Sequence, residues 1–420
     1  MELSEHLFRR ESGRMVAALT RIFGVHNLAL AEDVVQDAFC RALEVWTIRG
    51  LPDNPSAWLM TTAKHRALDI VRREGTARRF APDVSRWLTS EWTLGSAINE
   101  AFDPPVVRDE QLRMMFSCCH SQLSEDVQVA LMLNVLCGFG ASEIANAFLT
   151  SVAAMEKRIA RGKNVLARSS RLFDLTDAQF AARLSAVRRA LYLLFNEGYH
   201  ASSGNAAVRS GLCGEAIHLT LMLLDHPGAA TSETQALAAL MCLHAARLPA
   251  RLDVSGDLSG LADQDRSRWD AALVAQGLAL LDRSATGEVV TPFHIEAAIA
   301  AIHASAPSVE ETNWQEIVSL YDRLMAIAPS PIVALNRAIA ITQQDGPERG
   351  LEALESIDGR ERLDRYPFFR AALGEVELQR GHHAAARRHF EASLAVARNE
   401  TERRFFEKRV SACVDTAQRS

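Results

Sequence analysis

Apolar residues recur at helical spacing along most of the chain, and the alternating runs typical of strands are scarce. A first apolar stripe predicts an N-terminal helix, which Gly24 to Asn27 interrupt. Ala, Leu, Arg and Glu, which favour helices, are abundant. The pattern therefore predicts an all-α protein. The first stripe consists of Met15, Val16, Leu19, Ile22 and Phe23.

A second amphipathic helix is predicted from Ala29 to Trp46. Taken alone, its polar side is a solvated surface. The apolar side comprises Val34, Val35, Ala38, Phe39, Ala42, Leu43 and Trp46. The polar side comprises Glu32, Asp33, Gln36, Asp37, Arg41 and Glu44.

A loop over residues 48–55 precedes a third predicted helix, which the Ser56 hydroxyl is positioned to cap. The exposed side of this helix is basic and carries hydroxyls, a composition that suits nucleic acid because cations meet phosphates. Trp58 can serve either in the core or by stacking on an unpaired base. The expected buried side is Trp58, Leu59, Ala63, Ala67, Ile70 and Val71. The expected exposed side includes Thr61, Thr62, Lys64, His65, Arg66, Asp69, Arg72 and Arg73.

The segment from Leu123 to Arg168 predicts three helices separated by tight turns. Ser124 is expected to cap the first helix, which ends at Gly138 and Gly140 because glycine accepts left-handed backbone. The second helix is predicted over residues 142–148, and Ser151 is expected to cap the third. A short helix, a tight turn and a further helix form a helix-turn-helix, whose last helix enters the major groove of DNA.

The third helix of this segment is strongly basic. Residues four apart share a helix face, so Lys157 and Arg161 point the same way. At about 1.5 Å per residue the helix is about 25 Å long, enough to lie along a groove. The alternative is a solvated basic helix in an ordinary bundle. Its cations are Lys157, Arg158, Arg161, Lys163 and Arg168, against one acidic residue, Glu156.

Composition narrows the choice of class. The 420 residues suggest roughly three domains, and the net charge of −6 means that contacts to DNA must come from local basic patches. The seven cysteines include no CxxC pair, and the cluster Cys118-Cys119-His120 has no second ligand pair for zinc. We expect reduced, mostly buried thiols in a cytoplasmic protein, with a redox-sensing Cys118/Cys119 pair as the alternative. The N-terminus has no secretory apolar core, and no apolar run approaches the roughly 18 residues of a membrane span.

Three motifs together raise a specific resemblance. AEDVVQDAFCRALEVW, then NPSAWLMTTAKHRALDIVRRE, then the helix-turn-helix resemble regions 2 and 4 of bacterial extracytoplasmic-function (ECF) sigma factors, over about residues 5–170. The resemblance implies that the first motif binds the clamp helices of the RNA polymerase beta-prime subunit. The second helix and its preceding loop would recognise and melt the −10 element, and the helix-turn-helix would read the −35 element. Core polymerase, including its beta flap, and promoter DNA are the implied partners.

The same resemblance gives named side chains a role. The expected contacts to core polymerase are Asp33, Gln36, Asp37, Arg41 and Glu44. The expected contacts to the −10 element are Asn54, Trp58, Thr62, Lys64, His65, Arg66, Arg72 and Arg73. The expected contacts to the −35 element are Ser151, Lys157, Arg158, Arg161 and Lys163. No catalytic residue, metal ligand or cofactor is expected.

The chain continues for about 250 residues beyond the end usual for such a factor. The phrases LRMMFSCCHSQL and YLLFNEGYHASSG resemble one ECF subgroup with a C-terminal tetratricopeptide (TPR)-like domain. Near the end, Leu373-Gly374, Gly381, Ala386, Phe390 and Leu394 fall at TPR offsets, and Gly346 precedes Gly381 by 35 residues, about one repeat. The expected domains are region 2 over 1–75, a linker over 76–107, region 4 over 108–172 and a TPR-like α-solenoid over 173–420.

The extension begins with an apolar helix predicted from Phe180 to Phe195, and its short connection to the basic helix predicts direct packing on region 4. The polar stretch Asn196 to Gly204 is expected to be a hinge or docking loop, because no nucleophile, base and orienting group are legible there. A solenoid of helix pairs suits a peptide or protein partner, with a purely structural array as the alternative.

The sequence thus predicts a sigma factor, not an enzyme, whose extension modulates promoter-specific initiation. One alternative is a helix-turn-helix regulator with a TPR sensor that acts without polymerase. Another is a helical interaction scaffold whose basic helix is incidental. The motif from Asp33 to Trp46 and the basic helix after Ser56 argue against the regulator, because such a protein needs neither.

Overall fold

The computed structural model describes residues 2–74, 99–148, 150–168, 177–200, 209–253, 255–287 and 289–417. Within these ranges the regular structure is helical, apart from one isolated bridge between Leu252 and Leu258. The predicted all-α class is therefore confirmed. The chain forms two compact units, Met1–Leu194 and Phe195–Ser420.

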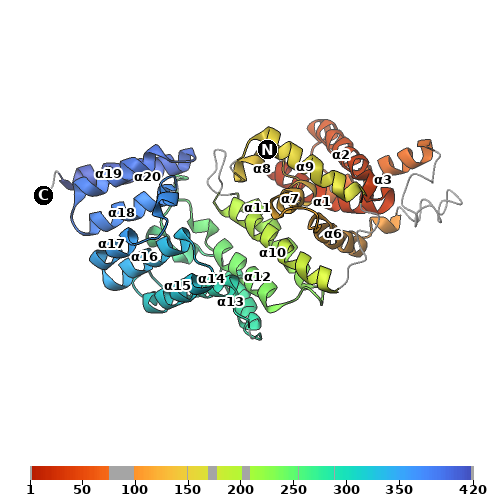
Figure 1. Cartoon of the computed structure of the whole chain (residues 1–420). Helices are drawn as coiled ribbons and strands as arrows, with labels where there is room; N and C mark the ends of the chain where they lie inside the picture. Colours follow the sequence, from red (N-terminus) through yellow and green to blue (C-terminus); the bar gives the residue numbers. More distant parts are fainter. Residues whose placement is uncertain are drawn as a thin grey trace. The chain divides into compact units, whose positions relative to one another are not determined.

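The first unit begins with α1 (Glu2–Phe23), α2 (Leu28–Arg49) and α3 (Pro55–Glu74) (Figure 1). All five residues of the first predicted stripe are buried. Gly24, with φ of 80°, ends α1 where the sequence predicted a break. α1 packs against both α2 and α3, so the N-terminal helices share one core.

The rest of the first unit contains α6 (Pro104–Cys118), α7 (Glu125–Leu131), a π-helical turn η3 (Met132–Leu136), α8 (Ala141–Ala147) and α9 (Val152–Arg168). The predicted helix-turn-helix is therefore present, with α9 as its last helix. α1 also packs on α6 and η3, which joins the N-terminal helices to the helix-turn-helix segment. Of the linker expected over 76–107, residues 76–98 lie outside the described part, and α6 already begins at Pro104.

α10 (Asp177–Tyr199) follows, and the boundary between the two compact units falls within it. Arg183 donates a hydrogen bond to the carbonyl oxygen of Phe116 at 3.2 Å, and Arg189 forms an ion pair of 2.7 Å with Glu125. Most of α10 therefore belongs with the helix-turn-helix segment, as the short connection predicted. The domain boundary expected at 172 lies outside the described residues.

Two capping predictions were wrong in detail. The Asn54 side chain, not Ser56, caps α3 by accepting from the Ala57 amide at 3.0 Å. Pro55 occupies the first helical position, which places Asn54 at the cap, and Ser56 instead donates to Glu11 at 3.0 Å. Ser124 precedes α7 as predicted, but its side chain makes no capping hydrogen bond.

Two burial and boundary predictions also fail. Leu43 is 55% exposed, because it lies with Gln36 and Cys40 on the outer face of α2 and not on the apolar stripe. The polar stretch expected to begin a loop at Asn196 is helical through Tyr199. Gly198 lets this end of α10 pass close to α11, since a side chain there would meet the Cys213 backbone nitrogen at 2.8 Å.

The second unit contains helices that pack mainly on their neighbours in sequence (Figure 1). The helices are α11 (Ser210–Leu224), α12 (Ser232–Ala245), α13 (Ala271–Ser284), α14 (Pro292–Ser305), α15 (Trp314–Ile327), α16 (Pro331–Asp345), α17 (Pro347–Glu355), α18 (Pro367–Gln379), α19 (His383–Ala395) and α20 (Glu400–Ala417). Short 3-10 turns include η4 (Leu248–Ala250), η5 (Leu261–Asp263), η6 (Arg266–Arg268) and η7 (Arg360–Leu363).

The helix pair predicted near the C-terminus is α18 and α19. Gly374 lets them approach closely, because a side chain there would lie 2.8 Å from the Phe390 ring. Ala386 and Phe390 are fully buried, and Gly381 makes the turn with φ of 78°. The residues that carried the repeat pattern therefore form the core of a helical hairpin.

Acidic residues after α12 are bound by cations of α20. Asp257 accepts from Arg404 at 2.5 Å and pairs with Lys408 at 2.7 Å. Asp263 pairs with Arg409 at 3.2 Å. The final helix of the second unit is thereby fixed to the segment that follows α12.

Candidate nucleic-acid interface

The expected polymerase contacts lie on one exposed face of α2. Asp33, Gln36, Asp37, Arg41 and Glu44 are all exposed, and Arg41 pairs with Glu44 at 3.2 Å. The same end of the helix and the following loop expose Leu43, Ile48 and Leu51. Polar groups beside exposed apolar side chains are typical of a protein-binding surface.

Asp37 links the two helices that the resemblance assigns to different partners. Its carboxylate accepts from Arg66 Nε on α3 at 2.9 Å. Both side chains remain about half exposed. The expected polymerase face of α2 and the expected −10 face of α3 are therefore adjacent surfaces.

The side chains expected at the −10 element have different environments along α3. Trp58 is half-buried and meets Trp46 edge-on, with ring centroids 5.4 Å apart, so it belongs to an aromatic cluster. Thr62 donates to the Trp58 carbonyl at 2.9 Å, while Lys64 is half-exposed and His65 exposed. Asn54 serves as the cap. The side chains of Arg72 and Arg73 lie outside the described part of the chain.

The α9 helix presents the expected −35 residues unequally. Ser151 caps the helix by accepting from the Ala154 amide at 3.3 Å, as predicted. Lys157 and Arg161 are exposed and one turn apart, whereas Arg158 is half-buried. The opposite face buries Met155, Ile159, Gly162 and Leu166. Gly162 permits close packing on α7, since a side chain there would lie 2.7 Å from Leu131.

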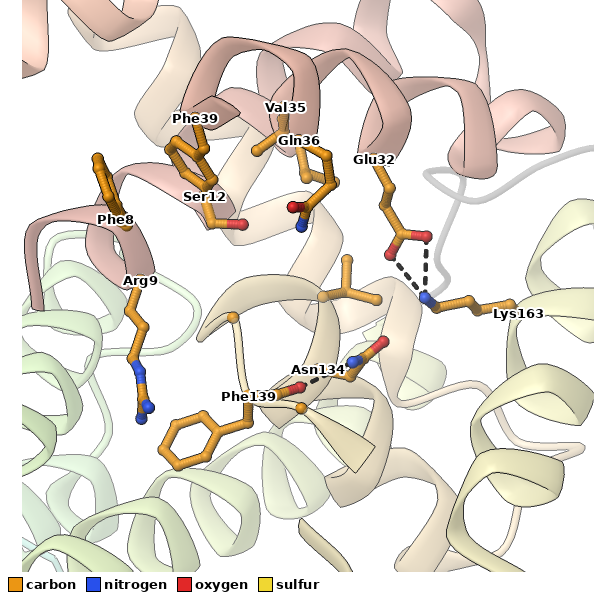
Figure 2. A pocket seen from close by; sticks show the side chains of 14 residues that line it. Phe8, Arg9, Ser12, Glu32, Val35, Gln36, Phe39, Asn134, Phe139 and Lys163 are labelled. Atoms are coloured by element: carbon orange, nitrogen blue, oxygen red, sulfur yellow. Dashed lines mark hydrogen bonds and ion pairs between the residues drawn. The ribbon is translucent and has the colours of Figure 1, made fainter. Parts of the chain in front are cut away.

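Lys163 does not share the Lys157 and Arg161 face. Two residues along a helix rotate a side chain by about 200°, so Lys163 points away from Arg161. Its Nζ donates to both carboxylate oxygens of Glu32 on α2, at 2.6 and 2.9 Å. Figure 2 shows this pair at one end of a cleft of about 500 Å³ between α1, α2 and the helix-turn-helix segment.

Further contacts join α1 to the helix-turn-helix segment. Arg9 on α1 pairs with Glu143 on α8 at 2.8 Å. Its guanidinium lies 5.0 Å from the centre of the Phe139 ring, and both side chains are labelled in Figure 2. Gly13 on α1 passes so close to η3 that a side chain there would lie 2.0 Å from the Leu136 carbonyl oxygen. The expected polymerase-binding and DNA-reading segments are thus closely packed in this arrangement.

The surroundings of Cys118 and Cys119 make both thiols unreactive. Cys118 and Cys119 are buried, and burial raises the pKa of the Cys118 thiol to about 12. The thiolate is the reactive form, so neither side chain has the properties of a redox sensor. Among the described residues no group of His, Cys, Asp and Glu could hold a metal ion.

Sequence reasoning missed the close contact between the two sigma-like segments. Glu32 and Lys163 are 131 positions apart, and each was visible only as one charge on its own helix. Gly13 was the available signal, because a glycine inside a helix is unfavourable unless another backbone approaches it.

Comparison with known families agrees with this geometry. Residues 7–77 match sigma-70 region 2, residues 113–166 match sigma-70 region 4, and residues 183–285 match a family of unknown function (DUF6596). No solved structure matches the chain. No helix among the described residues has the length and apolar content needed to cross a membrane.

Relatives of two kinds were found. Uncharacterized protein R00370 of Rhizobium meliloti (strain 1021) is 38% identical over 389 residues, which cover 92% of this chain and 90% of that protein. ECF RNA polymerase sigma factor SigK of Mycobacterium sp. (strain KMS) is 26% identical over 37% of this chain and 77% of its own length. Probable ECF RNA polymerase sigma factor SigI of Mycobacterium tuberculosis (strain CDC 1551 / Oshkosh) is 26% identical over 29% of this chain and 40% of its own length.

Regions 2 and 4 in one chain define an RNA polymerase sigma factor, a class of protein that is not enzymatic. The chain belongs to the ECF sigma factors. It also has a C-terminal helical extension, which includes the segment that matches the family of unknown function. The similarity to the Rhizobium protein covers nearly the full length of both chains.

Proposed function

We propose that this sigma factor docks on core polymerase through the exposed face of α2 and reads promoter DNA through α3 and α9. The observation that carries the proposal is that Asp33, Asp37 and Arg41 are exposed along one face of α2, while Lys157 and Arg161 are exposed along one face of α9. The first set suits the clamp helices of the beta-prime subunit, and the second suits phosphates and base edges of the −35 element. The beta flap is the expected contact of region 4.

We assign melting and recognition of the −10 element to α3 and the loop before it. His65 is exposed and Lys64 half-exposed on this helix, and Arg66 is beside the polymerase face. The half-buried Trp58 acts first as packing for Trp46. If Trp58 also stacks on an unpaired base, it would do so with the part of its ring that remains exposed.

The packed arrangement of regions 2 and 4 is proposed as the resting state of the free factor. Elements centred near −10 and −35 are about 25 base pairs apart, which is about 85 Å at 3.4 Å per base pair. An ion pair of 2.6 Å between Glu32 on α2 and Lys163 on α9 joins the two regions. Both elements cannot be read at once in this state, so binding to polymerase and promoter would separate the two regions.

The extension is proposed to be a TPR-like array that modulates initiation. Its helices pack on their sequence neighbours, and the α18 and α19 hairpin carries the residues of the repeat pattern. Such an array offers a surface for a protein or peptide. Because a sigma factor acts on polymerase, we place its site of action in the cytoplasm.

Stoichiometric capture by core polymerase, followed by run-off transcription from a mapped promoter, tests the proposal. A sigma factor binds core enzyme and confers initiation at that promoter. A polymerase-independent helix-turn-helix regulator, the second candidate, needs only the exposed face of α9 and would bind the DNA without core enzyme. Failure to bind core enzyme would overturn the sigma function.

A further inference from the structure

A group of unsatisfied polar side chains surrounds Arg247 in the second unit. The Tyr199 hydroxyl, His244 Nδ1, Trp269 Nε1 and His303 Nδ1 are buried and have no hydrogen-bond partner among the described residues. Buried polar atoms are almost always paired in folded proteins, and each unpaired one is costly. Four such atoms around one guanidinium therefore require an explanation.

Contacts place these groups together. Arg247 lies 5.4 Å from the centre of the Trp269 ring, and the Tyr199 ring lies 5.3 Å from that of His244. Arg251 lies over the Tyr199 ring at 3.9 Å. The side chains come from the ends of α10, α12 and α14 and from the residues that flank η4 and follow η6.

The two arginines have no acidic partner. Arg247 makes one side-chain hydrogen bond, a long one of 3.4 Å to Gln264, and neither Arg247 nor Arg251 has an ion pair among the described residues. The nearby carboxylates of Asp257 and Asp263 are bound by cations of α20. Two neighbouring guanidinium groups thus remain without a counter-charge.

The neighbouring histidines do not change the net positive charge of the two arginines. Burial, together with Arg247 and other cationic neighbours, lowers the pKa of His244 well below its usual value. Burial, with Arg247 and Arg266, lowers the pKa of His303 to about 4. Both imidazoles are neutral at neutral pH, so each can donate a hydrogen bond without adding positive charge.

A third arginine in this group, Arg266, differs from the other two because its guanidinium donates hydrogen bonds to several acceptors. Arg266 lies on the Trp269 ring at 5.2 Å, but it donates to the carbonyl oxygens of His303 and Ala306 and to the Thr312 hydroxyl. Arg266 therefore serves the fold. Arg247 and Arg251 are half-buried, and most of their N–H donors have no hydrogen-bond acceptor among the described residues.

We propose that Arg247 and Arg251 form the entrance of a binding site for the phosphate group of a small molecule, with the Tyr199 hydroxyl and His244 as further donors. Two guanidinium groups match the charge of a phosphate monoester better than that of a single carboxylate. The Tyr199 and Trp269 rings beside them offer an apolar surface to the rest of the ligand. The proposal concerns the extension alone and does not depend on sigma activity.

Thermal unfolding and calorimetry of the full-length protein, without polymerase, test the site with inorganic phosphate as the probe. Phosphate should raise the unfolding midpoint more than acetate or chloride does at equal ionic strength. Arg251→Gln should weaken phosphate binding at least about tenfold, because it removes a charge-assisted hydrogen bond. Arg349→Gln, an exposed arginine on α17 paired with Glu352, is the matched control and should bind like wild type.

Tyr199→Phe provides a second measurement that removes only the hydroxyl. If the Tyr199 hydroxyl donates to the phosphate, the variant should bind phosphate more weakly than wild type. Wild-type binding by the variant would remove this hydroxyl from the site. Equal responses to acetate and phosphate, or undiminished binding by folded Arg251→Gln and Tyr199→Phe, would overturn the proposal. Phosphoserine as a second probe separates a phosphate-ester site from one that accepts only the free ion.

Discussion

Lys163 Nζ lies 2.6 Å from Glu32 Oε1, so a cation of the DNA-reading helix is bound to the helix proposed to contact polymerase. Both side chains are just over one quarter exposed, at 28% and 27%. A pair of this exposure contributes on the order of 1 kcal/mol, well short of a permanent lock. Competition from promoter DNA or polymerase can therefore open it.

Glu32→Gln should release α9 in the free factor. Because about 1 kcal/mol corresponds to about fivefold, binding of a −35 duplex without polymerase should tighten several-fold. Fluorescence anisotropy with a labelled duplex measures the change. Glu44→Gln removes the same charge from the outer face of α2, where its partner is Arg41, and should have a smaller effect. Equal effects of the two variants would mean that charge alone, not release of α9, controls DNA binding.

Gly13→Ala should open the packed state by steric exclusion. The added carbon would lie 2.0 Å from the Leu136 carbonyl oxygen, and backbone cannot turn away as a side chain can. Alanine also favours the helix itself by about 0.5–1 kcal/mol, so α1 should stay folded. We expect a larger radius of gyration in solution scattering and faster proteolysis between regions 2 and 4.

Gly214→Ala is the control for that change, because Gly214 is also helical but has open space around it. It should leave the dimensions of the protein unchanged. A Gly13→Ala protein with wild-type dimensions and unchanged proteolysis would contradict the resting state proposed for regions 2 and 4.

Replacing Lys157 and Arg161 together by alanine should weaken promoter binding and flatten its salt dependence. A lost base contact costs about 1–3 kcal/mol, and each lost phosphate contact lowers the salt slope by about 1. Binding to core polymerase should survive, since both side chains are exposed on α9. Arg349→Ala with Arg387→Ala removes two exposed arginines from the extension and serves as the control. Wild-type transcription by the α9 double variant would remove this face from DNA recognition.

Asp37→Arg should impair assembly with core polymerase while leaving the fold intact. The exposed pair with Arg66 contributes little to stability, so unfolding should shift by roughly half a kcal/mol, whereas a reversed charge at an interface is costly. Asp322→Arg is a matched control, because Asp322 is equally exposed, at 53%, and pairs with Arg337. Titration of labelled core enzyme compares the two. Equal affinity for core would exclude α2 from the interface.

Much of the local structure could be predicted from the sequence. The stripe at Met15 to Phe23 and the cap at Ser151 follow from spacing and residue type, which act over a few residues. The predicted burial of Leu43 was wrong. Its neighbours Ala42 and Trp46 suggested a wide apolar side, but the buried side of α2 does not extend as far around the helix as Leu43. The helix-turn-helix motif also predicted that Lys157 lies on an exposed face of its helix, and Lys157 is exposed on α9.

Long-range relationships could not be predicted. The pairs Glu32 with Lys163 and Asp257 with Arg404 each join segments over 100 residues apart, and no local pattern encodes which charges meet. Tyr199 was expected in a loop, yet helix α10 carries it into the group around Arg247. The surroundings of a buried polar group depend on the whole fold, so the phosphate site had no signal in the sequence.

The extension should support transcription, and truncation tests this most directly. Removing everything after Leu172 deletes α10, whose Leu184, Val187 and Leu191 are buried. The cut would also break the contacts of Arg183 with Phe116 and of Arg189 with Glu125. Apolar surface of region 4 would then be exposed, so promoter-specific transcription should fall. Removal of only Tyr366 to Ser420, which keeps α10 and the first part of the second unit, should have an intermediate effect.

A cut after His200 separates the two causes, because it keeps α10 on the first unit and removes the rest of the extension. If α10 alone supports region 4, this variant should transcribe nearly as well as the full chain; if the second unit contributes as well, its activity should lie near that of the longest deletion. Run-off transcription with purified core enzyme and a mapped promoter measures all three. Higher activity after truncation would make the extension an inhibitor, and unchanged activity in every variant would leave it only a role in binding partners or ligands.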